Sequence, residues 1–447
     1  MSSPSVIAAS GPALRRELGR WDLTAIGINQ VIGGALFAQP SLYAASVGAW
    51  SLWLVVAVGV ASLLIALSFA EVSSRFDATG GPYLYARAAF GRFAAFEVGW
   101  MLWFTRVASW AAVINVLATA LSFYAPALAS GWLRAIFISL VIGAIAGINI
   151  RGIRLSSFVV NFLTVGKLLP LVTFVVVGLF LVDGSALVPA ETPTFAALSS
   201  TGLLLIFAFG GYEVIPVPAG EARDPRHAVP FALIMTIVIV SALTILIQIV
   251  ALGTLPGLAS SRTPLADAAS LFMGAGGAVL VTAGAVLATA GNNVGGALSG
   301  SRNLYALAEQ GDLPRVFGWV HPVFRTPVNA IVITSAATMA LALSGRYADL
   351  ALVSAISRLL VYVATCAATL RLRSPALAGR AKAPTFVVPY GPIIPVAAIA
   401  IALAMLSGAR RDQLIAGFVA LAAGAMLYLV AVRGRSPVHP SPIPQEP

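Results

Sequence analysis

Apolar runs long enough to cross a lipid bilayer follow one another along almost the whole chain. A helix needs about 20 consecutive apolar residues to span the hydrocarbon core. Only 10% of the 447 residues are charged, whereas a soluble domain carries about 25%. A β-barrel would show short alternating segments, which are absent here. We therefore expect an all-α integral membrane protein with about twelve transmembrane helices. Their expected positions are 22–45, 50–74, 93–124, 133–150, 156–182, 197–218, 229–253, 275–300, 328–344, 349–370, 392–407 and 413–432.

The composition excludes several classes of function. A single cysteine, Cys366, rules out a disulfide framework and a Cys-based metal cluster. The three histidines, at 227, 321 and 439, are too scattered for a metal site. We expect no cofactor, and no nucleic acid partner, because the net charge of +11 is spread over short loops. The chain has no phosphate-binding Gly-x-x-x-x-Gly-Lys-Ser/Thr loop, and its spans hold neither clustered acidic ligands nor a Ser/His pair, so no enzyme is predicted.

The basic residues of the loops predict the orientation in the membrane. Lys and Arg concentrate on the cytoplasmic side of membrane proteins. With the N-terminus inside, almost all loop Lys and Arg residues from Arg15 to Arg435 are also inside. Both termini are therefore expected to be cytoplasmic, in the inner (plasma) membrane of the cell. The outer segments then hold only Arg134, Arg262, Arg346, Arg410 and Arg411.

We divide the chain into four parts. Residues 1–20 form a cytoplasmic N-terminal segment without the pattern of a cleavable signal peptide. Residues 21–372 form a core of ten helices, and 373–434 contain helices 11 and 12. Residues 435–447 are Pro-rich, which predicts a disordered cytoplasmic tail.

Glycine pairs interrupt two of the expected spans. Gly33 and Gly34 lie in the first, and Gly210 and Gly211 lie in the sixth. Each glycine weakens a helix by about 1 kcal/mol. Small residues also allow close packing of membrane helices, which is the alternative explanation. The two spans are, however, matching members of two five-helix halves. Interrupted helices at corresponding positions indicate a substrate site between inverted repeats.

Four motifs, in order along the chain, resemble those of the amino acid–polyamine–organocation (APC) superfamily of amino acid permeases. Any one of them is weak, but the set spans most of the chain. They are GINQVIGGALF (27–37) closed by Pro40, ATGGPYLYARAAFG (78–91), FAFGGYE (207–213) followed by EARDPRHAVP (221–230), and SRNLYALAEQGDLPRVFGWVHPVFRTPVNA (301–330).

The resemblance implies a LeuT-like fold. Ten helices would form two inverted five-helix repeats with helices 1 and 6 discontinuous, and two more C-terminal helices would lie outside them. It also implies that N–H groups at Gly33, Gly34 and Ala35 bind the substrate carboxylate at the N-terminus of a half-helix. Carbonyls around Ile32 and at Phe207–Gly210 would accept hydrogen bonds from the substrate ammonium. Family members usually have glycine where this chain has Ala35, and the added methyl group narrows the loop.

Lys167 and Glu213 are the expected coupling or gating residues. The resemblance implies that a lysine in the fifth span takes the place of a sodium ion, which makes transport sodium-independent. Burial disfavours the charged form of a lysine, so Lys167 is a candidate for proton coupling. A permanently charged lysine that props the helices apart is one alternative, and a lysine that snorkels to the interface is another. Glu213 can couple to protons, pair with a cation or hold the broken helix in shape.

Arg106 is the most informative charged residue within a span. It either pairs with Glu213 or meets an acidic side chain of the substrate, because an unpaired arginine facing lipid is too costly. No role follows from the sequence for Arg358, which also lies within a span. Asn292 and Asn293 are expected to bond across helices, and Phe207 is either an aromatic lid or part of the core. The remaining candidates for substrate recognition are Gln30, Asn29, Thr105, Ser109, Tyr212 and Asn293.

The expected function is secondary active transport of amino acids or related amines by alternating access, proton-coupled and sodium-independent. An amino acid/product antiporter and a non-transporting amino acid sensor on the same fold are the alternatives. The expected partners are the small-molecule substrate, protons and membrane lipid, with the protein a monomer or homodimer.

Overall fold

The computed structural model describes residues 15–122, 126–128, 130–344, 347–407, 409 and 411–432. In this part of the chain the regular elements are helices, apart from an isolated bridge between Leu18 and Ala222. The expected tail at 435–447 and most of the segment 1–20 lie outside the described residues. The α-helices are α1 (Arg20–Val31), α2 (Ala35–Val47), α3 (Trp50–Ser73), α4 (Pro82–Phe90), α5 (Arg92–Ser122), α6 (Gly131–Arg151), α7 (Ile153–Gly178), α8 (Phe195–Phe209), α9 (Pro225–Thr254), α10 (Pro264–Glu309), α11 (Val328–Ser344), α12 (Tyr347–Arg371), α13 (Ile393–Ser407) and α14 (Arg411–Val432).

The all-helical prediction is confirmed, and each expected span coincides with one or two helices. Within the described part, five helical stretches are long and apolar enough to cross a membrane. Helices α4 and α10 differ from the prediction. The short helix α4 lies between two expected spans, and α10 extends beyond 275–300 at both ends. The expected start of that span coincides with a kink, where Gly274 has a φ of 66°.

The first expected span is interrupted. Helix α1 ends at Val31 and α2 begins at Ala35, so Ile32, Gly33 and Gly34 lie between the two helices. The N–H of Gly33 bonds back to the carbonyl of Val31 at 2.9 Å, which forms a tight turn.

The sixth expected span is interrupted more severely than predicted. Helix α8 ends at Phe209, and the next α-helix begins at Pro225. The prediction of a helix to residue 218 is therefore wrong, since only 3₁₀ turns at Tyr212–Val214 and Ala219–Glu221 follow the break. Pro216 and Pro218 explain the difference, because proline lacks the N–H that an α-helix needs.

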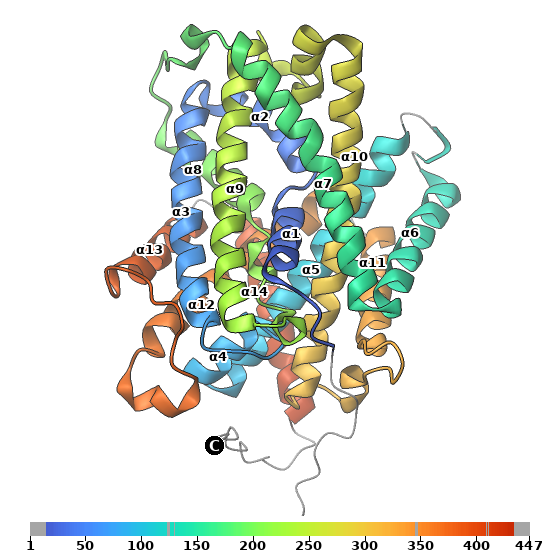
Figure 1. Ribbon diagram of the computed structural model, residues 1–447, viewed down its shortest axis with the longest axis vertical. Coiled ribbons are helices and arrows are strands. Elements are labelled where there is room, and N and C mark those ends of the chain that lie inside the picture. The colour runs from blue at the N-terminus through green and yellow to red at the C-terminus, as the bar shows by residue number, and fades with distance from the viewer. Residues whose placement is uncertain are drawn as a thin grey trace, which may run out of the picture.

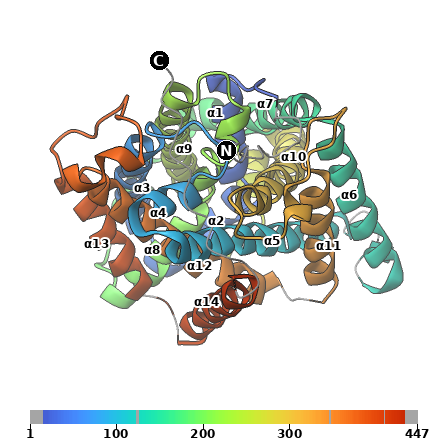
Figure 2. The same cartoon turned by 90° about the horizontal axis from the view of Figure 1, so that it is seen from below.

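The two interrupted segments lie in the interior of the bundle. In Figure 1, α1 lies between α9 and α7, and it packs against α7, α9 and α10. Figure 2 shows α6, α13 and α14 at the rim of the molecule. The unwound backbone is thus covered by protein, which is where a membrane protein tolerates irregular structure.

Candidate functional site

A buried lysine caps the end of α1. The last carbonyls of a helix have no partner within it. The Nζ atom of Lys167, on α7, donates to the carbonyl of Asn29 at 2.8 Å and to that of Ile32 at 2.6 Å. It also donates to Oδ1 of Asn29 at 2.7 Å. The lysine is fully buried. All three of its donors are therefore satisfied by neutral oxygens, and the carbonyl of Ile32, expected to meet the substrate, already has a partner.

Side-chain amides tie the break in α1 to the middle of α10. The Asn29 side chain donates to the carbonyl of Gly291 at 2.5 Å, and that of Gln30 donates to the carbonyl of Asn292 at 3.0 Å. In return, the Asn292 amide donates to the carbonyl of Gln30 at 2.9 Å. Asn293 was expected to bond across helices as well. Its side chain instead donates to the carbonyl of Thr289 on its own helix, at 2.8 Å.

The start of α2 presents an unused backbone donor. Among the described residues, no acceptor is found for the N–H group of Gly34. Gly33 and Gly34 are partly exposed, although they lie between two buried helix segments. Free N–H groups at a helix N-terminus favour an anion. The N–H of Gly33, the third expected donor, is instead bonded to the carbonyl of Val31, and carboxylate binding at this turn stays a prediction.

Glu213 lies just after the break in α8 and accepts four hydrogen bonds. Its Oε1 atom receives Nη2 of Arg106 at 2.8 Å and Nε of Arg358 at 2.9 Å. Its Oε2 atom receives the N–H of Gly211 and the hydroxyl of Tyr362, both at 2.8 Å. All these side chains are buried, with exposures of 5% or less. Of the two alternatives for Arg106, the structure has the ion pair with Glu213.

Two members of this cluster, Arg358 and Tyr362 on α12, have no role that the sequence could assign. A signal for both was present, since Arg358 is a charge within a span and Tyr362 follows it by one helical turn on the same face. Tyr212 stacks on Tyr362 with ring centroids 5.3 Å apart. What the sequence could not supply is the position of α12 beside the break in α8.

The two breaks touch each other at glycine residues. A side chain on Gly211 would collide with the backbone carbonyl of Gln30, and Gly211 has a φ of 134° that favours glycine. A side chain on Gly210 would collide with the guanidinium of Arg358. Nη1 of Arg106 also donates to Oε1 of Gln30 at 3.3 Å. The glycine pair in the sixth span therefore brings the second break into direct backbone contact with the last turn of α1.

The other candidates on α5 lie beside this cluster. The hydroxyl of Ser109 is 2.7 Å from that of Ser354 on α12. The hydroxyl of Thr105 is buried and has no partner among the described residues. The side chain of Phe207 lies outside the described part, so its expected role as a lid stays a prediction.

Ion pairs also link Arg302 and Arg373 to buried glutamates. Arg302 on α10 bonds Glu221 at 2.9 Å, and both are fully buried. The carbonyl of Glu221 also accepts the N–H groups of Glu17 and Leu18. Glu71 bonds Arg373 at 2.7 and 2.5 Å, and this hydrogen bond raises the pKa of Arg373. These contacts are ion pairs in which each carboxylate is buried.

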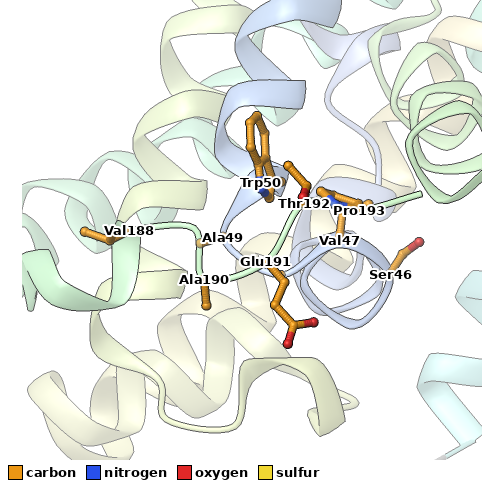
Figure 3. Close-up of a pocket in the computed structure, with 10 residues that line it drawn as sticks. Ser46, Val47, Ala49, Trp50, Val188, Ala190, Glu191, Thr192 and Pro193 are labelled. Atoms are coloured by element: carbon orange, nitrogen blue, oxygen red, sulfur yellow. The ribbon is translucent and has the colours of Figure 1, made fainter. Parts of the chain in front are cut away.

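A surface hollow of about 430 Å³ lies at the far end of α2 (Figure 3). Its walls are the α2–α3 turn, with Ser46 and Trp50, and the segment from Val188 to Pro193. Helix α2 has 13 residues and is therefore about 20 Å long. The hollow is thus remote from Lys167 and Glu213 and is not part of the candidate site.

Long apolar helices, buried charges and two unwound segments define a multi-pass membrane protein of the permease class. The sequence matches the family model described as amino acid permease over residues 18–430. The chain belongs to this family, as the four motifs indicated, and the family consists of transporters.

Individual relatives are also transporters. The chain is 31% identical over 344 residues to an uncharacterized transporter of Mycobacterium bovis, covering 74% of each protein. It is 28% identical over 404 residues to a serine/threonine exchanger of Bacillus subtilis, covering 87% of this chain and 89% of the relative. It is 28% identical over 350 residues to an arginine/agmatine antiporter of Chlamydia abortus, covering 73% and 71%.

Proposed function

We propose that this protein carries amino acids or related amines across the inner (plasma) membrane by alternating access, with both termini in the cytoplasm. In this proposal the core is a LeuT-like pair of inverted five-helix repeats, and transport is proton-coupled and sodium-independent. The observation that carries the proposal is the N–H of Gly34, which has no acceptor among the described residues and lies at the start of α2 beside the interrupted end of α1.

The two half-helices suit the two ends of a zwitterion. The N–H groups of Gly34 and Ala35 lie at the positive end of the α2 dipole and would bind the α-carboxylate. The C-terminal end of α8 carries the opposite partial charge, and its carbonyls at Phe207–Gly210 would accept the α-ammonium. Helix α8 packs against α2, which supports a site between them.

Lys167 supports sodium independence. Its ammonium occupies the oxygens of Asn29 and Ile32 that a cation would otherwise coordinate. Loss of its proton leaves only neutral groups behind, and this makes the lysine the proposed carrier of the coupled proton. A site for sodium at the same oxygens would require the lysine to leave.

Uptake by purified protein in proteoliposomes tests the proposal. We expect saturable uptake of at least one labelled α-amino acid without sodium, stimulated by an inward proton gradient. A thermal-shift screen of amino acids and polyamines on the same preparation identifies the substrate. Binding without flux would support a sensor instead, and no response to any α-amino acid would contradict the proposal.

The variant Lys167→Met tests the coupling role. We expect uptake that no longer depends on pH and does not acquire a sodium requirement. The control is Lys382→Met, which removes a half-exposed lysine paired with Asp77. Wild-type pH dependence in the Lys167 variant would exclude this residue as the proton carrier.

Exchange of one amino acid for another is a second candidate, because two relatives are named as an exchanger and an antiporter. Proteoliposomes loaded with unlabelled amino acid distinguish the two modes. An exchanger takes up label only when they are loaded, whereas a proton symporter also fills empty ones.

A further inference from the structure

The surface hollow at the far end of α2 is built from two segments that both lack basic residues. Its volume of about 430 Å³ falls within the range of small-molecule sites. One wall is the α2–α3 turn at 46–50, and the other is the segment at 188–193. The sequence contains no Lys, Arg or His from residue 21 to 74 or from 168 to 222. Neither wall therefore supplies a positive charge.

Two negative features line this hollow. Helix α2 ends there at Val47, and the last carbonyls of a helix carry a partial negative charge. The exposed carboxylate of Glu191 lines the same hollow and has no ion-pair or hydrogen-bond partner among the described residues. A helix C-terminus stabilises cations, and a carboxylate beside it is unfavourable. The hollow therefore has the electrostatic character of a cation site.

The remaining lining favours an organic cation over a metal ion. Glu191 is the single carboxylate among the described lining residues, whereas Ca²⁺ takes six to eight oxygen ligands. Most of the other lining side chains are apolar, among them the half-buried Trp50. Figure 3 shows Trp50 and Glu191 on opposite sides of the segment at 190–193. A ligand that contacts both needs a carbon chain as well as a positive charge.

We propose that this hollow binds the ammonium group of a small organic amine. The ammonium would lie between Glu191 and the end of α2, and the carbon chain would contact the apolar lining. This site differs from the proposed transport site, which binds a carboxylate at Gly34. Helix α2 has 13 residues and spans about 20 Å between the two. In the proposed orientation the hollow opens on the outer side of the membrane, so an external amine would contact the same helix as the transported substrate.

Binding of putrescine to the purified, detergent-solubilised protein tests this inference. Putrescine has two ammonium groups and no carboxylate, so the N–H of Gly34 offers it no anion interaction. Titration calorimetry at constant ionic strength should show saturable binding to the wild type. The variant Glu191→Gln should raise the Kd by at least about tenfold. No saturable binding to the wild type, or an unchanged Kd in the variant, would overturn the inference.

The variant Asp183→Asn is the matched control. Asp183 is an exposed carboxylate of the same α7–α8 connection, accepts the N–H of Ser185 and is not among the described lining residues. It should keep the wild-type Kd, and an equal loss of affinity would show unspecific attraction to acidic residues instead. Displacement of putrescine by calcium at constant ionic strength would assign the hollow to an inorganic cation and also overturn the inference. Because binding is measured without flux, these outcomes leave the proposed carrier function intact.

Discussion

The break between α1 and α2 leaves backbone carbonyl groups without helical partners, whereas the break after α8 leaves a backbone N–H group. A positively charged side chain binds the first, and a negatively charged side chain binds the second. At the first break, the ammonium of Lys167 holds carbonyl oxygens. At the second, the carboxylate of Glu213 holds the N–H of Gly211.

The surroundings of the two caps differ as well. Lys167 bonds only neutral groups, whereas Glu213 is enclosed by two arginines and a tyrosine. Removing the proton of the lysine leaves no unpaired charge, but neutralising Glu213 leaves two buried arginines. The first break is therefore suited to a side chain whose charge changes during transport. The second is suited to a side chain whose charge is permanent.

The largest effect on stability is expected for Glu213→Gln. Glutamine has nearly the same shape, so the bond from Gly211 can persist while the negative charge is lost. Removing one partner of a buried ion pair costs about 3–5 kcal/mol. We expect a large fall in the melting temperature of the detergent-solubilised protein.

The control for this prediction is Asp77→Asn. Asp77 pairs with Lys382, and their side chains are 40% and 46% exposed. An exposed pair contributes about 0–1 kcal/mol, so the melting temperature should change little. Equal shifts for the two variants would contradict a permanent ionic cap at the second break.

The variant Gly211→Ala tests the contact between the breaks. The φ of 134° and the adjacent carbonyl of Gln30 leave no room for a methyl group. A residue forced into such a backbone conformation costs about 1–3 kcal/mol. We expect a lower melting temperature and reduced uptake. Gly202→Ala on α8, where a side chain would meet open space, is the control and should be neutral.

The smallest effect is expected for Asn292→Ala at the first break. This variant removes one hydrogen bond to the carbonyl of Gln30, which is worth about 0.5–1.5 kcal/mol. The melting temperature should fall by less than in Gly211→Ala. A larger fall would show that the amide ties to α10, rather than Lys167, hold the first break in shape.

Much of the fold follows from the sequence because hydrophobicity is a local property. Apolar runs such as 50–74 and 229–253 coincide with α3 and α9 to within a few residues. The glycine pairs also mark both breaks, since glycine weakens a helix wherever it stands. The length of the second break was less predictable. Pro216 and Pro218 can be accommodated within a membrane helix when neighbours satisfy the freed groups, and here the helix does not resume.

The sequence by itself determined the membrane class, the family and the presence of charges within the spans, among them Arg106, Glu213 and Arg358. Their pairing was decided by the tertiary structure. Arg106, Glu213 and Arg358 are separated by more than a hundred residues from one to the next, and only the packing of α5 and α12 against the break brings them together. A charge within an apolar run shows that a partner is needed, but the partner's identity depends on distances that only the folded chain defines.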